Sequence, residues 1–470
     1  MSVLDAVVLA AGRGTRMKSE LPKVLHPIAG RPLLYFPVRA ALDLGARRVV
    51  VVVSPDTREA VQQSLARHLP NAPLDYAVQE RALGTGDAAK AGLGPLTDPG
   101  RVLFLYGDTP LLEASDLRPV LGPLEAGASL AFLTFEAEDP TGYGRIVRDA
   151  AGDPRAIVEQ RDLAGAAEHA ITEVNAGIYA GEVELLRSAL ASLKPQNAQG
   201  EYYLTDIVAE IARRFSVATA SADPASLVGV NDRQQLAEAE TRLHARIRER
   251  LARTGVSIVG EPLIDDGVLV EVDARIEAGV RLRGSTRIGA GTVVDVGSVL
   301  EDAEVGRQVI IKPYTVITQS RVRDGAVLGP FCHLRPGSDI GDSAHVGNFV
   351  ETKNAQLGAG AKANHLAYLG DVDVGARSNV GAGTIVCNYD GFAKRRTTVG
   401  TDVFIGSDSQ LVAPVTVGDG AYVGTGTTVT EDVPAGALAI GRVRQENRLD
   451  YAAGLRERLR ARAAEAKKKG

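Results

Sequence analysis

Aliphatic residues recur at every sixth position between about residues 270 and 429. One run reads Val270, Ile276, Leu282, Ile288, Val294 and Leu300. Many of the aliphatic residues in this pattern are followed directly by glycine, as in Ile288-Gly289 and Ile340-Gly341. A period of six matches neither the 3.6-residue period of a helix nor the alternation of a hairpin strand. It is typical of a chain that makes a short strand, turns a corner and makes another, so that its aliphatic side chains stack in one interior column. We therefore predict a parallel β-helix of hexapeptide repeats.

The alternative is a valine-rich β-sandwich, but its strands would be separated by turn signals about every 8–12 residues, which this segment lacks. One insertion interrupts the repeats. Thirteen positions separate Val386 from Val399 where six are expected, so the residues from Asn388 to Arg396 must leave the coil as a loop. Loops inserted into solenoids often build the binding face.

The first two hundred residues have a different pattern. Unbroken apolar runs at 6–11, 49–53 and 102–106 alternate with helical stretches. This alternation predicts a mostly parallel α/β sheet with both faces covered. Ligands bind beyond the carboxyl ends of the strands in such sheets, and Gly12–Arg16 and Gly107-Asp108 fall at two of those ends.

Four segments are expected along the chain. The α/β domain occupies residues 1–230, and an amphipathic connecting helix follows at 231–254, marked by Leu236, Leu243 and Leu251. The β-helix then occupies residues 255–450, and 451–470 form a terminal helix with a basic tail.

Composition narrows the function classes. The chain has 470 residues, a net charge of −5 and a pI near 5.9, so global charge gives no reason to expect nucleic-acid binding. Its two cysteines form no disulfide framework or zinc pattern. The N-terminus does not resemble a signal peptide, and no apolar run reaches the roughly 18 residues needed to span a membrane. We expect a cytoplasmic protein without nucleic-acid or membrane partners.

The segment Leu9-Ala10-Ala11-Gly12-Arg13-Gly14-Thr15-Arg16-Met17, followed by Leu21-Pro22-Lys23, resembles the signature of the sugar nucleotidyltransferases. Glycines let backbone N–H groups approach phosphates. Arg16 and Lys23 are the candidate catalytic cations, because they can balance the charge that builds on a pyrophosphate leaving group.

Further motifs sharpen this resemblance, and they cover nearly the whole chain in order. They are Gln79, Leu83–Gly86, Tyr106–Asp108, Gly142–Arg145, Ile157–Glu159, Asn175–Gly177 and Gly229–Asn231. Together they resemble the bacterial enzymes that join N-acetylglucosamine-1-phosphate uridyltransferase and glucosamine-1-phosphate N-acetyltransferase activities in one chain. The resemblance implies a Rossmann-like nucleotidyltransferase domain followed by a left-handed parallel β-helix that carries acetyltransferase activity.

Carried over by position, the resemblance implies a uridyl-transfer site for UTP and N-acetylglucosamine 1-phosphate. Its expected members are Leu9, Ala10, Ala11, Gly12, Lys23, Gln79, Gly84, Thr85, Tyr106, Gly107, Asp108, Gly144, Glu159, Asn175 and Asn231. Among them, Gly144, Glu159 and Asn175 would hold the N-acetylglucosamine.

The same resemblance implies that Asp108 and Asn231 bind Mg²⁺, since carboxylate and amide oxygens are suitable ligands for this hard cation. Each residue has a structural alternative. Asp108 alone could be an ordinary strand-end residue, and Asn231-Asp232 could cap the connecting helix.

The β-helix carries a second set of motifs of this family. They are Leu334–Gly337, Val350–Lys353, Asn364–Asp371, Asn379–Thr384 and Cys387–Gly391. Acyl transfer to an amine needs a base of near-neutral pKa, and His365 is the candidate base. A lone histidine in a repeat protein is usually structural, as His333 and His345 are taken to be, so His365 is singled out by the residues around it.

The resemblance assigns glucosamine 1-phosphate to Arg335, Lys353, Tyr368 and Asn379. The acetyl-CoA contacts it implies are Ala382, Asn388, Tyr389, Ser407, Thr425 and Arg442. Thr425 departs from the family, which commonly has alanine there. Cys332 and Cys387 are expected to be buried small residues rather than nucleophiles.

Two rival functions remain open from the sequence. A single-activity sugar-phosphate nucleotidyltransferase would use its β-helix only for assembly or regulation, and it would need no base or phosphate cations in the repeats. A non-enzymatic scaffold, such as the exchange-factor subunits of translation initiation, would have lost the glycine-rich turn and Asp108. The resemblance also implies a homotrimer.

Overall fold

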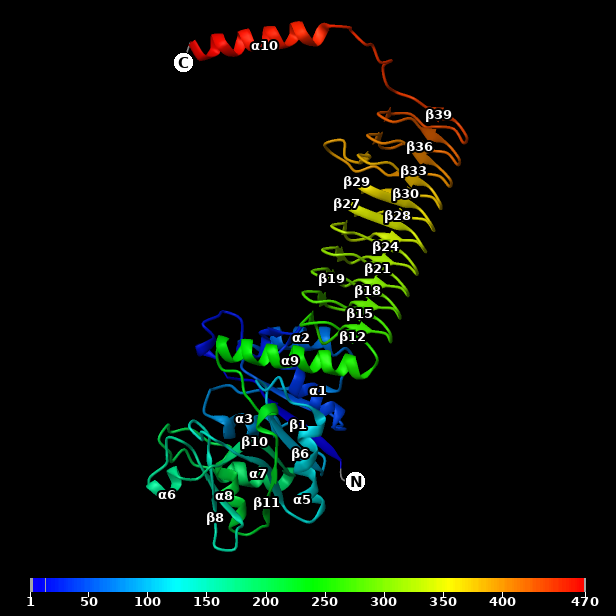
Figure 1. The fold of residues 1–470 in the computed structure, drawn as a ribbon. Helices are drawn as coiled ribbons and strands as arrows, with labels where there is room; N and C mark the ends of the chain where they lie inside the picture. The colour runs from blue at the N-terminus through cyan, green and yellow to red at the C-terminus, as the bar shows by residue number, and fades with distance from the viewer. Residues whose placement is uncertain (1–2, 13, 469–470) are drawn as a thin grey trace. The chain divides into compact units, whose positions relative to one another are not determined.

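The structure is a computed structural model that describes residues 3–12 and 14–468, so Arg13 of the glycine-rich turn and the last two residues of the basic tail lie outside it. The described chain forms two compact units (Figure 1). Unit 1 extends to Arg253 and includes the short segments Leu263–Val268 and Leu282–Gly284, and the rest of the chain forms unit 2.

A mixed, mostly parallel sheet forms the centre of unit 1 (Figure 1). Its main strands run in the order β11-β7-β10-β6-β1-β4-β5, and β10 is antiparallel to both of its neighbours. Their bounds are β1 Leu4–Leu9, β4 Val49–Val53, β5 Leu74–Val78, β6 Arg101–Tyr106, β7 Leu130–Glu136, β10 Glu173–Glu182 and β11 Val217–Ser221. A smaller pair, β8 (Arg145–Arg148) and β9 (Pro154–Val158), adjoins β10.

The central strands are buried on both faces, as their continuous apolar runs predict. All five valines of β4 have no exposed surface. Helix α3 (Thr85–Leu93) packs on β1, β4 and β5, and α1 (Tyr35–Asp43) also packs against β1 and β4. The approach of α3 is close enough that a Cβ on Gly92 would lie 2.4 Å from the side chain of Val7.

The carboxyl ends of β1 and β6 lie side by side, because the two strands are paired in parallel with Leu9 opposite Tyr106. The N–H of Gly107 donates to the carbonyl of Leu9 at 2.9 Å. This pairing places the turn after β1 next to Asp108, as expected for a ligand-binding edge of an α/β sheet.

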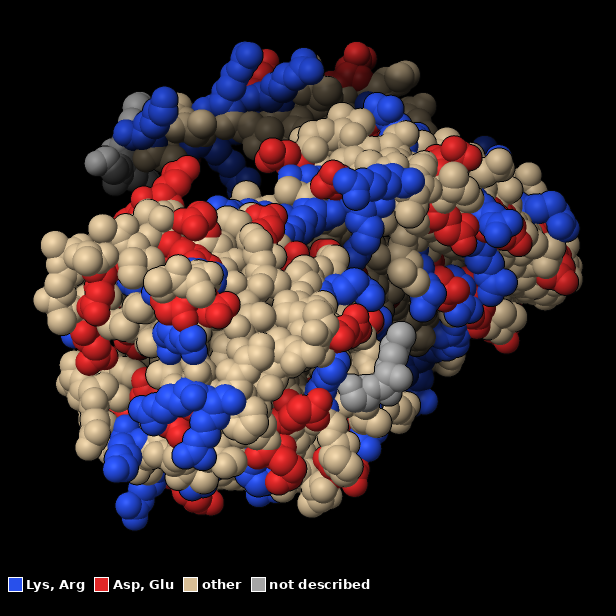
Figure 2. All heavy atoms as spheres, turned by 90° about the horizontal axis from the view of Figure 1, so that it is seen from below, with Lys and Arg blue, Asp and Glu red and all other residues tan. Residues whose placement is uncertain are grey.

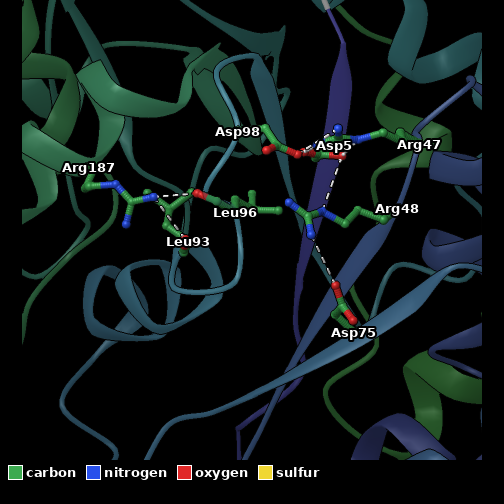
Figure 3. A network of polar contacts seen from close by, with 8 residues as sticks. All are labelled: Asp5, Arg47, Arg48, Asp75, Leu93, Leu96, Asp98 and Arg187. Atoms are coloured by element: carbon green, nitrogen blue, oxygen red, sulfur yellow. Dashed lines mark hydrogen bonds and ion pairs between the residues drawn. The ribbon is translucent and has the colours of Figure 1, made fainter.

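A buried carboxylate ties together the opposite ends of these strands (Figure 3). Asp5 on β1 is only 1% exposed, and both of its oxygens accept hydrogen bonds from Arg47, at 2.8 and 3.1 Å. Arg48 lies 3.7 Å from Asp5 and 3.6 Å from Asp75 on β5, while Arg47 also bonds the exposed Asp98. The network links β1, the residues before β4, and β5 through a single buried charge.

Unit 2 is a parallel β-helix in which three short strands make each coil (Figure 1). Paired residues are usually 17 or 18 positions apart, as for Val270 opposite Ile288 and Ile288 opposite Val305. The predicted hexapeptide repeat is therefore one side of a three-sided coil, and each one-residue slip in the sequence is a shorter corner. The insertion after Val386 enlarges one coil, since Val374 pairs with Val399, 25 positions later.

The corners of the coils use the left-handed backbone region, where side chains other than glycine are costly. At two of the three corners, the non-glycine residues in this region are polar or charged, for example Gln308 and Ser343 at one and Asp302 and Asn354 at another.

The third corner, which we call the apolar corner, carries bulky apolar residues over four successive coils. Its members are Tyr314, Phe331, Phe349 and Leu366, with φ between 42° and 57°. All four are about half exposed, and the three aromatic rings are stacked with centroids 5.4 and 5.5 Å apart.

The two longest of the described helices are α9 and α10. Helix α9 (Arg233–Arg253) buries one stripe of side chains that includes Leu236, Leu243, Ile247 and Leu251, as its amphipathic pattern predicts. Helix α10 (Tyr451–Lys468) is mostly exposed and basic. On the face of the molecule shown in Figure 2, basic and acidic side chains are interspersed.

Replacing Asp5 with alanine is expected to lower the free energy of unfolding of unit 1 by about 3 kcal/mol, because it leaves Arg48 without its buried partner. Asp98→Ala is the matched control, since its carboxylate is 56% exposed and its pair with Arg47 contributes less than about 1 kcal/mol. Urea denaturation followed by circular dichroism measures both. Equal effects of the two substitutions would contradict the central role of Asp5.

Candidate functional sites

The glycine-rich turn of unit 1 runs from the end of β1 to the short helix Lys23–Leu25. Gly14 has a φ of 60°, and a Cβ at this position would lie 2.4 Å from the Cβ of Lys23. Glycine is therefore required for both backbone conformation and space. By contrast, a Cβ on Gly12 would meet nothing within 4 Å, so the turn leaves open space beyond the end of β1.

Lys23 joins two residues that come from distant parts of the chain. Its Nζ donates to Oδ2 of Asp108, which follows β6, and to Oδ1 of Asn231 at 3.2 Å. Arg16 donates to the same Asn231 oxygen at 3.2 Å. The structure thus gathers both predicted catalytic cations and both predicted Mg²⁺ ligands in one place.

Asn231 does not cap the connecting helix. Asp232 takes that role, because its Oδ1 accepts from the N–H of Gln235 at 2.9 Å. The N–H of Asn231 donates to Oε1 of Gln235, which fixes the backbone and leaves the Asn231 amide oxygen directed at the two cations. The dipeptide thus does cap the helix as the alternative predicted, but through Asp232, and the Asn231 side chain is left for the two cations.

Asp108 and Asn231 also fit a Mg²⁺ site chemically. Their oxygens converge on one cationic group, and two protein ligands leave positions for water and phosphate oxygens. Within residues 3–12 and 14–468, no cluster of three or more His, Cys, Asp or Glu side chains could hold a metal. The ion would thus depend on substrate for part of its coordination.

Gln79, Gly84 and Thr85 form a second part of this edge of the sheet. The Gln79 amide donates to the carbonyl of Gly84 at 3.0 Å and to Asp87 at 2.9 Å. Gly84 has a φ of 114°, and a Cβ there would lie 2.4 Å from the carbonyl oxygen of Tyr202. The loop that precedes α3 is thus fixed against Tyr202, a contact that the sequence motifs did not reveal.

The residues expected to hold the sugar also come together. The N–H of Asn175 donates to the carbonyl of Gly144 at 2.9 Å, and a Cβ on Gly144 would lie 3.5 Å from the Glu159 carboxylate. Burial raises the pKa of Glu159, although a hydrogen bond from Thr205 opposes this shift. Thr205 was not predicted from the sequence, because it lies on a separate segment just before α8 (Asp206–Ala212).

Tyr106 lies between the residues expected to hold the sugar and Asp108, the partner of Lys23. Its ring packs against Gly177, where a Cβ would lie 2.6 Å away, and burial raises its hydroxyl pKa, with Glu159 and Asp108 adding to the effect. Contacts of Tyr106 thus link the region around Glu159 and Gly177 with the region around Asp108.

In unit 2, His365 lies on β29 (Lys362–Gly370) directly opposite Asn348 on β27 (His345–Lys353). Its Nδ1 is 3.0 Å from Oδ1 of Asn348. With the proton on Nδ1 donated to this amide oxygen, the lone pair of Nε2 is free to accept a proton. Asn348 was not predicted, and the signal for it is its position one 17-residue coil before His365.

The predicted acetyl-CoA residues extend this pair into what we call the base column. The register of the paired strands, continued two residues further, aligns His365 with Ala382, then with Ser407, then with Thr425 on successive coils. Backbone hydrogen bonds between these coils support the alignment, such as Asp408 N–H to the carbonyl of Ala382 at 2.7 Å. Coils are about 4.8 Å apart, so the column extends about 14 Å from His365 to Thr425. Arg442 donates to the carbonyl of Thr425, the last residue of the column.

The predicted phosphate cations gather at another corner of the same coils. Arg335 pairs with Glu351 at 2.8 Å, and Lys353 lies 3.9 Å from Asp371. Lys394, on the inserted loop, is close enough to Lys353 that the two ammonium groups interact and the pKa of Lys394 is lowered. We call Arg335, Lys353 and Lys394 the cation cluster.

Hydrogen bonds fix the acidic centre of this cluster. Burial opposes ionisation of Asp371, yet hydrogen bonds from Asn354 and Asn388 hold its pKa below the usual value. Tyr368 lies over Gly370, where a Cβ would be 2.4 Å from the phenol oxygen and 2.8 Å from the Asn388 amide nitrogen. Asn388 therefore has a structural role that was not predicted, whereas Tyr389 is largely exposed on the loop.

Not all predicted acetyl-transfer residues are brought together within one chain. Asn379 pairs with Lys362, before the His365 corner, whereas Tyr368 lies after it. The two cysteines also differ from each other. Cys332 is buried, and burial raises its thiol pKa to about 11, but Cys387 is only half-buried, so the expectation of burial is wrong for Cys387.

Comparisons with known proteins agree with this architecture. Residues 6–198 match the family of MobA-like NTP transferase domains, and residues 396–431 match the bacterial transferase hexapeptide family as six repeats. A bifunctional protein GlmU from Sorangium cellulosum is 55% identical over 97% of this chain and 98% of its own length. The chain belongs to the GlmU family. The GlmU proteins of Anaeromyxobacter sp. and Geobacter sulfurreducens are 52% and 45% identical, over 99% and 95% of this chain and 94% and 98% of their own lengths.

Membership of the GlmU family confirms the predicted fold class, an α/β nucleotidyltransferase domain followed by a β-helix of hexapeptide repeats. None of the described helices is long and apolar enough to cross a membrane.

Asn348→Ala is expected to lower acetyl transfer to glucosamine 1-phosphate about tenfold. Without its hydrogen bond to Asn348, His365 is less well oriented, which raises the activation free energy by roughly 1.4 kcal/mol. Since the loss acts through the imidazole, the pH profile of kcat/KM should change, while uridyl transfer should not. His333→Ala, which alters an outward-facing histidine on β25 (His333–Leu334), is the control. An unchanged pH profile would exclude Asn348 as a positioning residue.

Proposed function

We propose that this chain makes UDP-N-acetylglucosamine in two steps. Unit 2 acetylates glucosamine 1-phosphate with acetyl-CoA, and unit 1 then couples N-acetylglucosamine 1-phosphate to UTP and releases pyrophosphate. The observation that carries the proposal is that each unit holds its own reactive constellation, Lys23 with Asp108 and Asn231 in unit 1 and His365 with Asn348 in unit 2. Membership of a family of bifunctional proteins supports it.

For uridyl transfer, Asp108 and Asn231 would hold Mg²⁺, and Arg16 and Lys23 balance negative charge on the phosphates. The bound ion supplies further neutralisation of the triphosphate. The sugar phosphate oxygen attacks the α-phosphorus of UTP while the bond to pyrophosphate breaks. The residues of unit 1 mainly position the two substrates, and Glu159 and Asn175 are proposed to bind the sugar.

For acetyl transfer, Nε2 of His365 accepts a proton from the substrate ammonium group. The freed amine attacks the thioester carbonyl of acetyl-CoA and a carbon–nitrogen bond forms. The carbon–sulfur bond then breaks, and the proton that the nitrogen loses goes to the departing sulfur, so that CoA leaves as the thiol. Acetyl-CoA is proposed to lie along the base column, and the cation cluster is proposed to bind the substrate phosphate.

The base and the cation cluster are far apart within one chain. Lys353 pairs with Gly370, five residues beyond His365, which is about 16 Å along the chain, and the corner at Leu366 turns the chain between them. In glucosamine 1-phosphate, the amine and phosphate are on neighbouring carbon atoms. The distance favours a site completed by a second copy, in which His365 and Asn379 of one chain work with the cation cluster and Tyr368 of another.

The apolar corner supports such an assembly. Tyr314, Phe331, Phe349 and Leu366 are bulky residues in a strained backbone region and remain about half exposed. Both the strain and the exposure are unfavourable in an isolated chain. A neighbouring copy would cover them, and Leu366 directly follows His365, so the contact would extend to the site. We propose the homotrimer expected of the family, with this corner in the interface.

Release of CoA thiol from acetyl-CoA, measured with glucosamine 1-phosphate and without UTP, tests the central claim. Release that depends on the sugar phosphate is expected. A folded protein that makes pyrophosphate from UTP and N-acetylglucosamine 1-phosphate but releases no CoA would reduce the β-helix to a scaffold.

His365→Ala is expected to lower acetyl transfer at least about a hundredfold, the usual contribution of a general base, and to leave uridyl transfer intact. Asp108→Ala should have the opposite selectivity, because it removes a proposed metal ligand in the other unit. Separate assays of CoA release and pyrophosphate release measure the two activities. Loss of both activities from either substitution in a folded protein would contradict two independent sites.

Mixed trimers test whether two chains share the acetyl-transfer site. His365→Ala and Lys353→Ala chains are each expected to be inactive alone. When they are co-expressed with different tags and purified through both tags, the mixed trimers should show about one third of the parent activity, because one of the three interfaces in each mixed trimer combines two intact halves. No recovery in mixed trimers, or a monomeric parent protein by light scattering, would place the whole site on one chain.

A further inference from the structure

The ammonium group of Lys23 lies where a divalent cation would compete with it. Lys23 Nζ bonds Oδ2 of Asp108 and lies 3.2 Å from Oδ1 of Asn231, and these are the two groups proposed above to hold Mg²⁺. A carboxylate and an amide oxygen accept an ammonium group or ligate a metal with the same lone pairs. Lys23 and the metal therefore share their partners.

The fold keeps Lys23 in this place. The aliphatic stem of its side chain packs against Gly14, whose lack of a Cβ is what makes the contact possible, and only 13% of the side chain is exposed. Arg16 adds a second positive charge at Asn231. A divalent ion would bring the number of cationic groups around the pair Asp108 and Asn231 to three, with one carboxylate charge among them, which is unfavourable unless one cationic group leaves or anions arrive.

We propose that Lys23 is an exchangeable occupant of the metal position: it fills that position in the nucleotide-free protein and leaves it when Mg²⁺ and nucleotide phosphates enter. The phosphate oxygens then provide the ammonium group with new acceptors. This inference rests on the proposed assignment of Asp108 and Asn231 as metal ligands.

Exchange of this kind links metal binding to nucleotide binding. A metal ion can bind only those molecules in which Lys23 has left Asp108 and Asn231. The apparent metal affinity is therefore the intrinsic affinity multiplied by the fraction of such molecules. A nucleotide that draws Lys23 away raises the metal affinity, and the metal must raise the nucleotide affinity by the same factor. Lys23 would thus discourage metal binding until substrate phosphates are present.

Titration with Mn²⁺, followed by water-proton relaxation in the absence of nucleotide, tests the proposal without any turnover. Lys23→Met is expected to bind Mn²⁺ about tenfold more tightly than the parent protein. The substitution removes the ammonium group that competes for Asp108, and a charge-assisted hydrogen bond contributes about this much free energy. Lys18→Met is the matched control. Lys18 is an exposed lysine of the same turn, and its replacement should change the affinity less than about twofold, because its exposed charge is strongly screened.

Equal or weaker Mn²⁺ binding by folded Lys23→Met would overturn the proposal. The same would follow if Lys18→Met tightened binding as much, since the effect would then be one of net charge. At saturating UDP-N-acetylglucosamine, the difference between parent and Lys23→Met should shrink, and a difference that persists unchanged would exclude release of Lys23 by phosphates.

Asp108→Asn separates this inference from the proposed function. Loss of Mn²⁺ binding in Asp108→Asn together with unchanged binding in Lys23→Met would reject the exchange alone. Unchanged binding in Asp108→Asn would reject the metal assignment itself.

Discussion

Hydrogen-bonded stacking of the coils is the constraint on which unit 2 depends. Most strands pair with a strand 17 or 18 residues later, and the coil with the insertion pairs over 25 residues, so that a sequence period becomes columns of aligned side chains. The base column follows from it, because the register of the paired strands, with hydrogen bonds between successive corners, aligns His365, Ala382 and Ser407. Coils of 17, 18 and 25 residues keep the same columns, because the extra residues leave the coil at a corner or as a loop, so strand pairing fixes the site as well as the core.

Parallel pairing has the corresponding role in unit 1, where adjacent carboxyl ends bring the turn after β1 next to Asp108. The two units thus apply one principle. Regular strand pairing aligns residues from distant parts of the chain, and irregular segments then carry functional side chains. Gly14 and the inserted loop with Lys394 are such segments.

The sequence predicted the β-helix, the parallel strands and the clustering of Lys23 with Asp108 and Asn231, because periodicity and motifs report local backbone and residue type directly. It did not predict Asn348 or Thr205. Asn348 becomes visible only when the coil length is known, and Thr205 depends on how a separate helix packs. The cap of α9 was ambiguous for a related reason: Asn231 and Asp232 are both good caps, and only the three-dimensional structure shows which side chain turns back.

The apolar corner also affects how the stability of unit 2 should be understood. Tyr314, Phe331 and Phe349 are stacked on one another, yet each leaves about half of its surface in water. If that surface is covered only by another copy, part of the folding free energy becomes available only on association. The melting temperature would then rise with protein concentration, and dilute or newly made chains would be the ones most exposed to aggregation and proteolysis.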